Sequence, residues 1–213
     1  MTARLAALAG AALLAALASG CAAPFAEYQG ARTAGRGNVE ITGSYTSVHF
    51  SGQGESGELQ REYTAQLAAG TGDHTDWRFR YTRIGPPGGD SGGGGVNVFG
   101  FGPKFAAASE RVAVALPVGF AFGSNIDVVD TFQFHPTVFV TVPWSTGLEL
   151  NTSGKVLVPL KSGSVGFAAN VGFGISSNLA LWAVRPEVGV LKYTDSDGYV
   201  MQFGLGLSYN LGH

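Results

Sequence analysis

The sequence predicts an all-β fold, a closed antiparallel up-and-down β-barrel of about ten strands. Three observations favour it. From residue 38 onward, apolar side chains occupy every second position in successive segments. These segments are long for strands, and the connections between them alternate between short turns and longer loops. Alternation with a period of two indicates strands whose two faces meet different surroundings.

The composition excludes several classes of protein. The 213 residues suit about one domain and include 33 Gly, with only 13% charged residues. An average soluble domain has about 25% charged residues. The formal net charge of -2 leaves no basic surface for nucleic acid, so we expect no nucleic-acid partner. A single cysteine excludes an internal disulfide and a cysteine-based zinc site.

Residues 1–20 are predicted to be a secretory signal peptide, because one positive charge precedes a short apolar run and then small residues. Residues 17–21, Leu-Ala-Ser-Gly-Cys, resemble a bacterial lipobox, in which the cysteine becomes the acylated first residue. We therefore expect lipidation at Cys21. The alternative is an ordinary secreted protein that begins near Cys21 with a free thiol. Residues 21–37 show no helical or strand period and predict a lipidated tether before a barrel domain at 38–213.

The strands follow from the alternating segments. The predicted strands are residues 38–50, 58–69, 75–84, 95–106, 111–122, 131–143, 147–160, 164–175, 179–193 and 198–211. The connections at 70–74, 107–110, 144–146 and 176–178 are short, whereas those at 85–94 and 123–130 are longer. Short turns at one end and longer loops at the other are typical of barrels that cross an outer membrane. Both ends of the barrel domain then fall at the short-turn end, where we also expect a lipid on Cys21, in the inner leaflet.

The size of the residues on each face predicts which face meets lipid. In the last segment Phe203, Leu205 and Leu207 point one way, while Gln202 and Ser208 point the other way. A soluble barrel with an apolar interior has the same alternation turned inside out. Its exterior would then consist mainly of Gly, Ala, Ser and Thr, which is a poor surface toward water. We therefore expect the large apolar residues to face hydrocarbon and the small or polar residues to face the lumen.

Aromatic residues on the apolar face gather near the short turns. Outer-membrane barrels carry girdles of aromatic residues at the membrane interfaces. The predicted girdle at the short-turn end is formed by Trp77, Trp144, Trp182 and Tyr209.

Over residues 38–211 the chain resembles the small outer-membrane β-barrel proteins of Gram-negative-type bacteria, in a lipoprotein version. The resemblance implies contact with membrane lipid and insertion by the barrel assembly machinery. Acidic residues in the long loops could also recruit divalent cations shared with lipopolysaccharide phosphates. The chain departs from the common pattern in lacking a C-terminal aromatic residue. It also places prolines inside predicted strands, where we expect local bulges: Pro103, Pro117, Pro136, Pro159 and Pro186.

Eight charged residues fall on the predicted lumen face: Glu40, Glu62, Arg78, Arg80, Glu149, Lys155, Arg185 and Glu187. Four acids and four bases balance, and buried charges must be paired, so one interpretation is a polar network that makes the barrel rigid. The other is a narrow path for small hydrophilic solutes, with these charges setting selectivity. Ten strands enclose much less space than the 16 to 18 strands of an open porin.

The sequence therefore favours an outer-membrane β-barrel lipoprotein with a structural role or a narrow passive channel. The alternative is a lipid-anchored periplasmic β-barrel that binds an apolar ligand. We expect no enzyme activity, because the central histidine, His135, has no carboxylate at its same-face neighbours Gln133 and Thr137. We expect no cofactor and no metal site.

Overall fold

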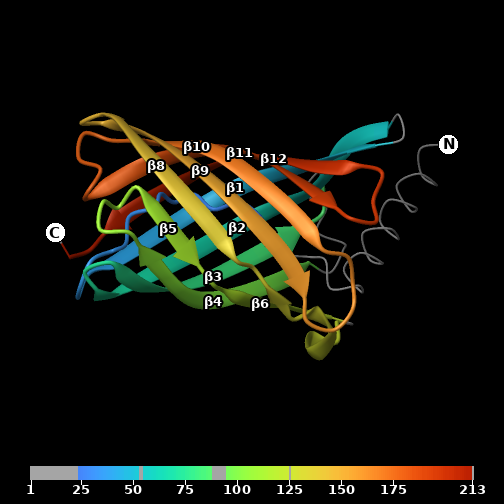
Figure 1. The fold of residues 1–213 in the computed structure, drawn as a ribbon. Coiled ribbons are helices and arrows are strands. Elements are labelled where there is room, and N and C mark those ends of the chain that lie inside the picture. The colour runs from blue at the N-terminus through green and yellow to red at the C-terminus, as the bar shows by residue number, and fades with distance from the viewer. Residues whose placement is uncertain (1–23, 53–54, 88–94, 125, 213) are drawn as a thin grey trace.

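The computed structural model describes residues 24–52, 55–87, 95–124 and 126–212. These residues form one barrel of tilted antiparallel strands (Figure 1). The predicted signal peptide and Cys21 lie outside the described residues.

The observed strands agree closely with the predicted segments. In chain order they are β1 (Val39–Gly52), β2 (Glu55–Gly72), β3 (Thr75–Gly85), β4 (Val96–Ala106), β5 (Val112–Ala115), β6 (Val118–Phe122), β7 (Gln133–Phe134), β8 (Thr137–Ser145), β9 (Leu148–Pro159), β10 (Gly166–Ile175), β11 (Trp182–Tyr193) and β12 (Tyr199–Asn210). A short 3-10 helix, η2 (Val128–Thr131), precedes β7.

The barrel has ten strands in its described part, because two strands are each divided in two. β5 and β6 both pair with β4, and β7 and β8 both pair with β9. The last strand, β12, pairs along its whole length with β1, from Glu40 opposite Asn210 to Ser51 opposite Tyr199. This seam closes the sheet, so every strand has a neighbour on both sides. The predicted fold class is confirmed.

Prolines account for the divided strands. Pro117 separates β5 from β6, and Pro136 separates β7 from β8. Proline has no N–H to donate to a neighbouring strand, so it interrupts the ladder. Pro186 lies inside β11, and the pairing of β11 with β10 is missing beside it, although the register is kept on both sides. Pro103 lies within the register of β4 and β3, and Pro159 within that of β9 and β7, both without a bulge, contrary to the prediction.

The apolar face of the strands points outward. On β12 the side chains of Phe203, Leu205 and Leu207 are 47%, 54% and 57% exposed, whereas Gln202 is fully buried. The interior is lined by polar and charged side chains. This arrangement contradicts the alternative of a periplasmic barrel with an apolar ligand inside, because the large apolar residues are outside.

The two ends of the barrel differ. Connections of two to six residues join β2 to β3, β4 to β5, β8 to β9 and β10 to β11 at one end, which we call the short-turn end. The two ten-residue connections, from β3 to β4 and from β6 to β7, lie at the other end, which we call the long-loop end. The junctions of β1 with β2, β9 with β10 and β11 with β12 lie there too and are shorter. Outward-facing charges on the strands lie near the long-loop end, at Arg61, Arg83 and Lys192. The outer wall between the two ends is apolar.

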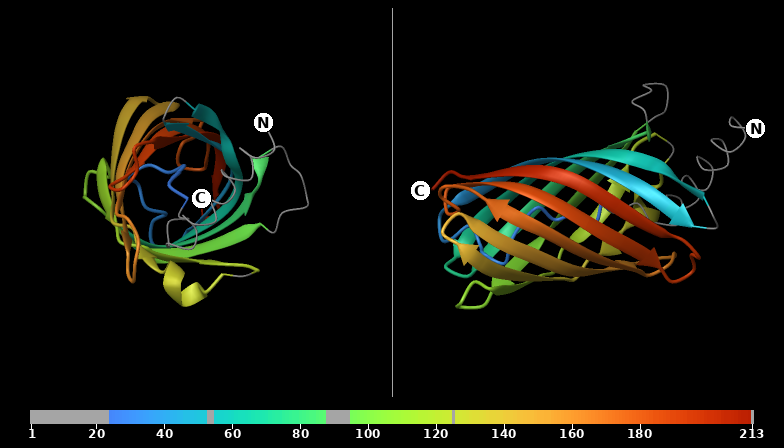
Figure 2. Two further views of the ribbon diagram at one scale, coloured as in Figure 1. Left: turned by 90° about the vertical axis from the view of Figure 1, so that its right-hand side faces the viewer. Right: turned by 90° about the horizontal axis from the view of Figure 1, so that it is seen from above.

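Residues 24–37, which we call the lumen segment, run through the interior of the barrel. Figure 2 shows this blue trace inside the ring of strands in the end-on view. The segment has no regular secondary structure, as its sequence suggests, yet Phe25, Glu27, Tyr28, Ala31 and Ala34 are buried. The structure thus differs from the tether expected here, because these residues pack within the barrel domain.

The lumen segment also crosses from one end of the barrel to the other. Phe25 packs with Val48, Leu157 and Leu191, which lie on strands close to the long-loop end. At its other terminus, Gly37 donates a backbone hydrogen bond to Gly70 beside the first short turn. The expectation that the chain before β1 stays at the short-turn end is therefore wrong for residues 24–37.

Candidate functional site

The lumen is the candidate site, because charged side chains from most of the wall converge there on the lumen segment. The eight charged residues assigned to the lumen by the sequence all lie on the inner face, and each is buried or half-buried. The structure adds four more charged residues to this set: Glu27 and Arg32 from the lumen segment, Asp76 from β3 and Lys104 from β4.

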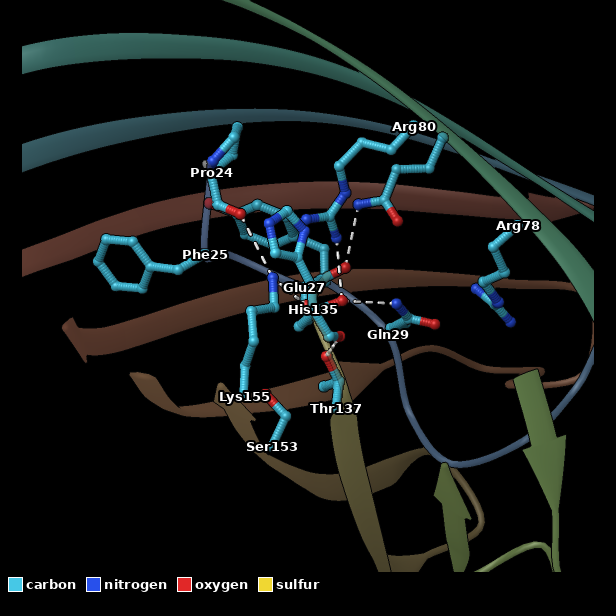
Figure 3. A network of polar contacts seen from close by, with 12 residues as sticks. Pro24, Phe25, Glu27, Gln29, Arg78, Arg80, His135, Thr137, Ser153 and Lys155 are labelled. Carbon is cyan, nitrogen blue, oxygen red and sulfur yellow. Dashed lines mark hydrogen bonds and ion pairs between the residues drawn. The ribbon is translucent and has the colours of Figure 1, made fainter. Parts of the chain in front are cut away.

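Glu27 is the centre of the interactions near the long-loop end (Figure 3). One carboxylate oxygen lies 2.5 Å from Nζ of Lys155, and the other lies 2.9 Å from a guanidinium nitrogen of Arg80. Gln29 also donates to this carboxylate at 2.7 Å. Burying a carboxylate costs free energy because the group loses its bound water. Here two cations and an amide replace that water and offset the cost. This contact joins the lumen segment to β3 and β9, on separate parts of the wall.

Glu187 binds the main chain of the lumen segment. Its two carboxylate oxygens accept the backbone N–H groups of Glu27 and Tyr28, each at 2.8 Å. Gln66 donates to the carbonyl of Glu27 at 3.0 Å, and Asn170 donates to the carbonyl of Phe25 at 2.8 Å. Wall side chains thus replace the hydrogen bonds that a neighbouring strand would supply, as buried backbone groups require.

Lys104 holds the middle of the lumen segment. It is fully buried, and its ammonium group donates to the Gly30 carbonyl at 2.6 Å, the Arg32 carbonyl at 2.9 Å and the Gln29 side chain at 3.1 Å. The same group lies 4.7 Å from the centre of the Phe139 ring. All three hydrogen-bond acceptors belong to the lumen segment, so this cation depends on the segment for its solvation.

Tyr28 occupies a trough of glycines on β12. A Cβ atom at Gly206 would lie 3.0 Å from the Tyr28 side chain, and one at Gly204 would lie 1.7 Å from its hydroxyl oxygen. The hydroxyl forms a 2.6 Å hydrogen bond with the hydroxyl of Thr46 on β1. These two inward-facing positions are glycines because a side chain there would collide with Tyr28.

A second group of charges lies toward the short-turn end. Glu149 binds Arg32 of the lumen segment and accepts from Arg185 at 3.2 Å. Asp76 binds Arg78 through two 3.0 Å hydrogen bonds and accepts the backbone N–H of Ala34 at 3.0 Å. The lumen segment is therefore held by ionic contacts near both ends.

Two further charged residues complete the set. Glu40 lies 3.4 Å from Arg78. Glu62 is buried on β2 and accepts a hydrogen bond from Gln60 at 2.7 Å. The charged network thus extends around the wall from β1 to β11.

His135 forms a polar contact with an amide side chain. Its Nε2 lies 3.0 Å from Oε1 of Gln133, and its backbone carbonyl accepts from Thr137 at 2.9 Å. The ring is buried beside Gly119, where a Cβ atom would lie 3.1 Å from it. Gln133 is an amide and cannot act as the carboxylate of a catalytic triad.

Two cavities lined by described residues adjoin the lumen segment. One, of about 460 Å³, lies at the short-turn end beside Arg32, Arg111 and Glu149. The other, of about 50 Å³, lies near Glu27, His135 and Lys155 and has room for only one or two water molecules. The larger cavity is an entrance from the short-turn side whose inner wall is formed partly by Arg32 of the segment.

The predicted aromatic girdle lies on the outer surface. Trp77, Trp144 and Tyr209 are 42%, 68% and 48% exposed, and Trp182 is partly exposed. Trp182 is the register partner of Tyr209, and Trp144 stacks on Phe173 with ring centres 6.4 Å apart. All four residues lie near the short turns.

Acidic residues of the long loops find partners within the loops. Asp130 forms an ion pair with Lys161, which raises the pKa of that lysine above its ordinary value. Ser164 donates to Asp195 at 2.6 Å, and this hydrogen bond lowers the pKa of the Asp195 carboxyl. Within the described residues no group of His, Cys, Asp and Glu side chains has a geometry that could hold a metal ion.

Sequence reasoning missed the charges that depend on the lumen segment. Lys104 could have been found, since it shares the inward parity of Gly100 and Gly102. Glu27 and Arg32 lie in a segment without a period, so no pattern indicated that they are inside the barrel. The described residues include no helix long and apolar enough to cross a membrane.

Comparisons with known proteins return likenesses of fold only. No family model matches, and no curated protein matches. Among solved structures, the chain is similar to Ail, the attachment invasion locus protein of Yersinia pestis, at 14% identity and a TM-score of 0.38, covering 83% of this chain and 99% of Ail.

Two other solved structures show comparable similarity. The translocator domain of the autotransporter NalP from Neisseria meningitidis is 11% identical with a TM-score of 0.44, covering 81% of this chain and 88% of that domain. The KdgM porin is 8% identical with a TM-score of 0.42, covering 81% and 98%. Because these identities and TM-scores are low, the assignment of the fold depends on the strand pairing within this chain.

Replacement of Glu187 by glutamine is expected to loosen the lumen segment. The glutamine side chain has one oxygen, so it can accept only one of the two backbone N–H groups. Its NH₂ group would face the second N–H, and two donors cannot bind each other. A hydrogen bond to a charged group contributes about 1.5–3 kcal/mol, so amide exchange at Glu27 and Tyr28 should become about 10 to 100 times faster. Hydrogen exchange measured by NMR checks this. Glu55→Gln at an exposed position is the control, and equal exchange in both variants would contradict the assigned role.

Replacement of Lys104 by methionine tests the middle of the segment. The change keeps the shape of the side chain but leaves the carbonyls of Gly30 and Arg32 without their donor. An unsatisfied buried group costs about 1–3 kcal/mol, so the free energy of unfolding should fall by at least this amount. Urea unfolding in detergent micelles measures it. The exposed Lys161→Met variant should change stability by less than about 0.5 kcal/mol.

Proposed function

We propose that the chain is an integral outer-membrane β-barrel with a structural role, and that its own N-terminal segment closes the lumen. The observation that carries this proposal is the position of residues 24–37 inside the ring of strands, with their main-chain and charged groups bound by the wall. In this proposal the protein is not an enzyme and needs no cofactor.

The outer surface supports a membrane location. Large apolar side chains that are more than a third exposed occur on nearly all the strands, among them Tyr63, Phe79, Phe101, Val140 and Val188. A soluble protein seldom exposes a continuous apolar surface of this extent. In a bilayer the same surface meets hydrocarbon, and barrel closure satisfies the backbone hydrogen bonds of every strand, as the bilayer requires.

The filled lumen supports a structural role over a passive channel. Ten strands enclose a narrow interior, and the lumen segment adds a main chain and side chains such as Phe25, Tyr28 and Arg32 to that space. Most of the charges there are paired with one another or with main-chain groups, whereas Glu62 accepts from the amide of Gln60. A channel for small hydrophilic solutes remains as the second candidate, supported by the entrance of about 460 Å³ at the short-turn end.

Export and assembly follow from the same proposal. We propose that residues 1–20 are a secretory signal peptide, that Cys21 is acylated and that the barrel assembly machinery inserts the barrel. Exposed acidic residues at the long-loop end, such as Glu55 at the start of β2, would be the contact points for cations bound to lipopolysaccharide. No part of the proposal involves nucleic acid.

A charge on the outer wall tests the membrane location. Val188→Arg places a cation in the middle of β11, where outward side chains would meet hydrocarbon. Arginine at the bilayer midplane costs about 2–4 kcal/mol and near the interface about 0–1 kcal/mol. We therefore expect a large loss of stability in lipid vesicles for Val188→Arg and a small one for Tyr199→Arg at the strand end. Equal stability of the two variants would argue for a wall that faces water.

Conductance tests the closed lumen. In planar bilayers the full chain should show no steady conductance, whereas a chain that begins at Asn38 should conduct ions through the emptied lumen. Heat-modifiable migration on a gel should first show that both proteins are folded. Steady conductance of the same size from both would favour the channel and contradict closure by the lumen segment.

A further inference from the structure

We propose that the chain threads its barrel from the outside inward, so that the residues before Pro24 leave the barrel on the cell surface and the N-terminal end is held at the outer leaflet. This inference rests on the proposed function, because that function determines which mouth faces the cell exterior. It replaces the expectation that a lipid on Cys21 lies in the inner leaflet.

The direction of the lumen segment is determined by contacts at its two ends. At the long-loop end, Phe25 packs with Val48, Leu157 and Leu191, while Lys155 donates to the Pro24 carbonyl at 3.3 Å. At the short-turn end, Asn210 donates to the Ala34 carbonyl at 3.4 Å. Because the chain runs from Pro24 to Ala34, it enters at the long-loop mouth and reaches β1 at the short-turn mouth.

The segment is also locked against sliding. Glu27 is bound by Lys155 and Arg80, and Tyr28 lies in the glycine trough of β12. Near the other end, Ala34 donates its N–H to Asp76. Moving the segment by one residue would break all of these contacts together, since each involves a particular side chain or main-chain group.

The length of the chain decides which leaflet Cys21 can reach. Cys21 precedes Pro24 by three residues, and three residues span at most about 11 Å. The hydrocarbon core of a bilayer is about 30 Å thick. From the long-loop mouth Cys21 therefore cannot reach the inner leaflet around the barrel, and the lumen already holds the chain.

The lipid surface that fits this geometry is the outer leaflet. Long loops of outer-membrane barrels face the cell exterior, and short turns face the periplasm. An acyl group on Cys21 would insert beside the long-loop mouth, since three residues separate Cys21 from Pro24. The barrel and the lipid would then anchor the same chain from opposite ends of the lumen segment.

Epitope tags placed in the complete protein test the direction. One tag is inserted between Ala23 and Pro24, a second in the long loop between Gly92 and Gly93, and a third in the short turn between Asp73 and His74. On intact cells we expect antibody to bind the first and second tags, and to bind the third only after the outer membrane is permeabilised.

The three tags separate this inference from the proposed function. If the loop tag is accessible and the tag before Pro24 is not, the threading direction is wrong, but the proposed outer-membrane barrel is not contradicted. If the loop tag is inaccessible on intact cells and becomes accessible only on permeabilising, the proposed orientation fails, and the inference fails with it.

Disulfide cross-linking gives a measurement that does not depend on the membrane or on the inserted tag. In a Cys21→Ser background behind an ordinary signal peptide, Phe25→Cys with Leu157→Cys should form a disulfide, and so should Ala34→Cys with Asn210→Cys. The crossed pair, Phe25→Cys with Asn210→Cys, is the matched control and should stay reduced. A disulfide in the crossed pair but not in the first pair would overturn the direction.

Discussion

The structure depends on one constraint: polar groups in the narrow interior of this barrel must find partners within the barrel. Lys104 and Glu187 are buried on opposite parts of the wall, and the groups that satisfy them belong largely to the lumen segment. The lumen segment depends on the wall in turn, because its main chain has no neighbouring strand and needs wall side chains to bind its N–H and carbonyl groups. The wall and the segment therefore satisfy each other, and neither forms a complete polar structure alone.

The small residues of the inner face follow from this constraint. A ten-stranded barrel with large inward side chains would have no room for a passing chain. Gly204 and Gly206 leave space for the ring of Tyr28, and Gly119 leaves space for His135. The high glycine content of the chain thus reflects, at these positions, what lies inside the barrel and not flexibility of its strands.

The strands, their inward and outward faces and the eight charged lumen residues could be predicted from the sequence. A period of two survives in any strand that separates hydrocarbon from a polar interior, so local pattern was sufficient there. Irregularity was expected at Pro117 and Pro136 because of the missing N–H donor, but as a bulge, whereas the structure divides both strands there. The position of residues 24–37 could not be predicted, because their partners, such as Glu187 and Asn210, lie up to 176 residues away in the sequence and leave no periodic mark.

The position of Tyr28 links the start of the described chain to the closure of the barrel. Its ring rests on β12 and its hydroxyl binds Thr46 of β1, so it bridges from inside the two strands that close the barrel. These strands are the first and the last to be made, whereas Tyr28 is made before either. The seam has the packing described here only when Tyr28 lies within the ring, so the earliest part of the described chain completes the closure of the barrel. A barrel that closes without it would lack the hydrogen bond to Thr46, and the seam would thereby distinguish a filled barrel from an empty one.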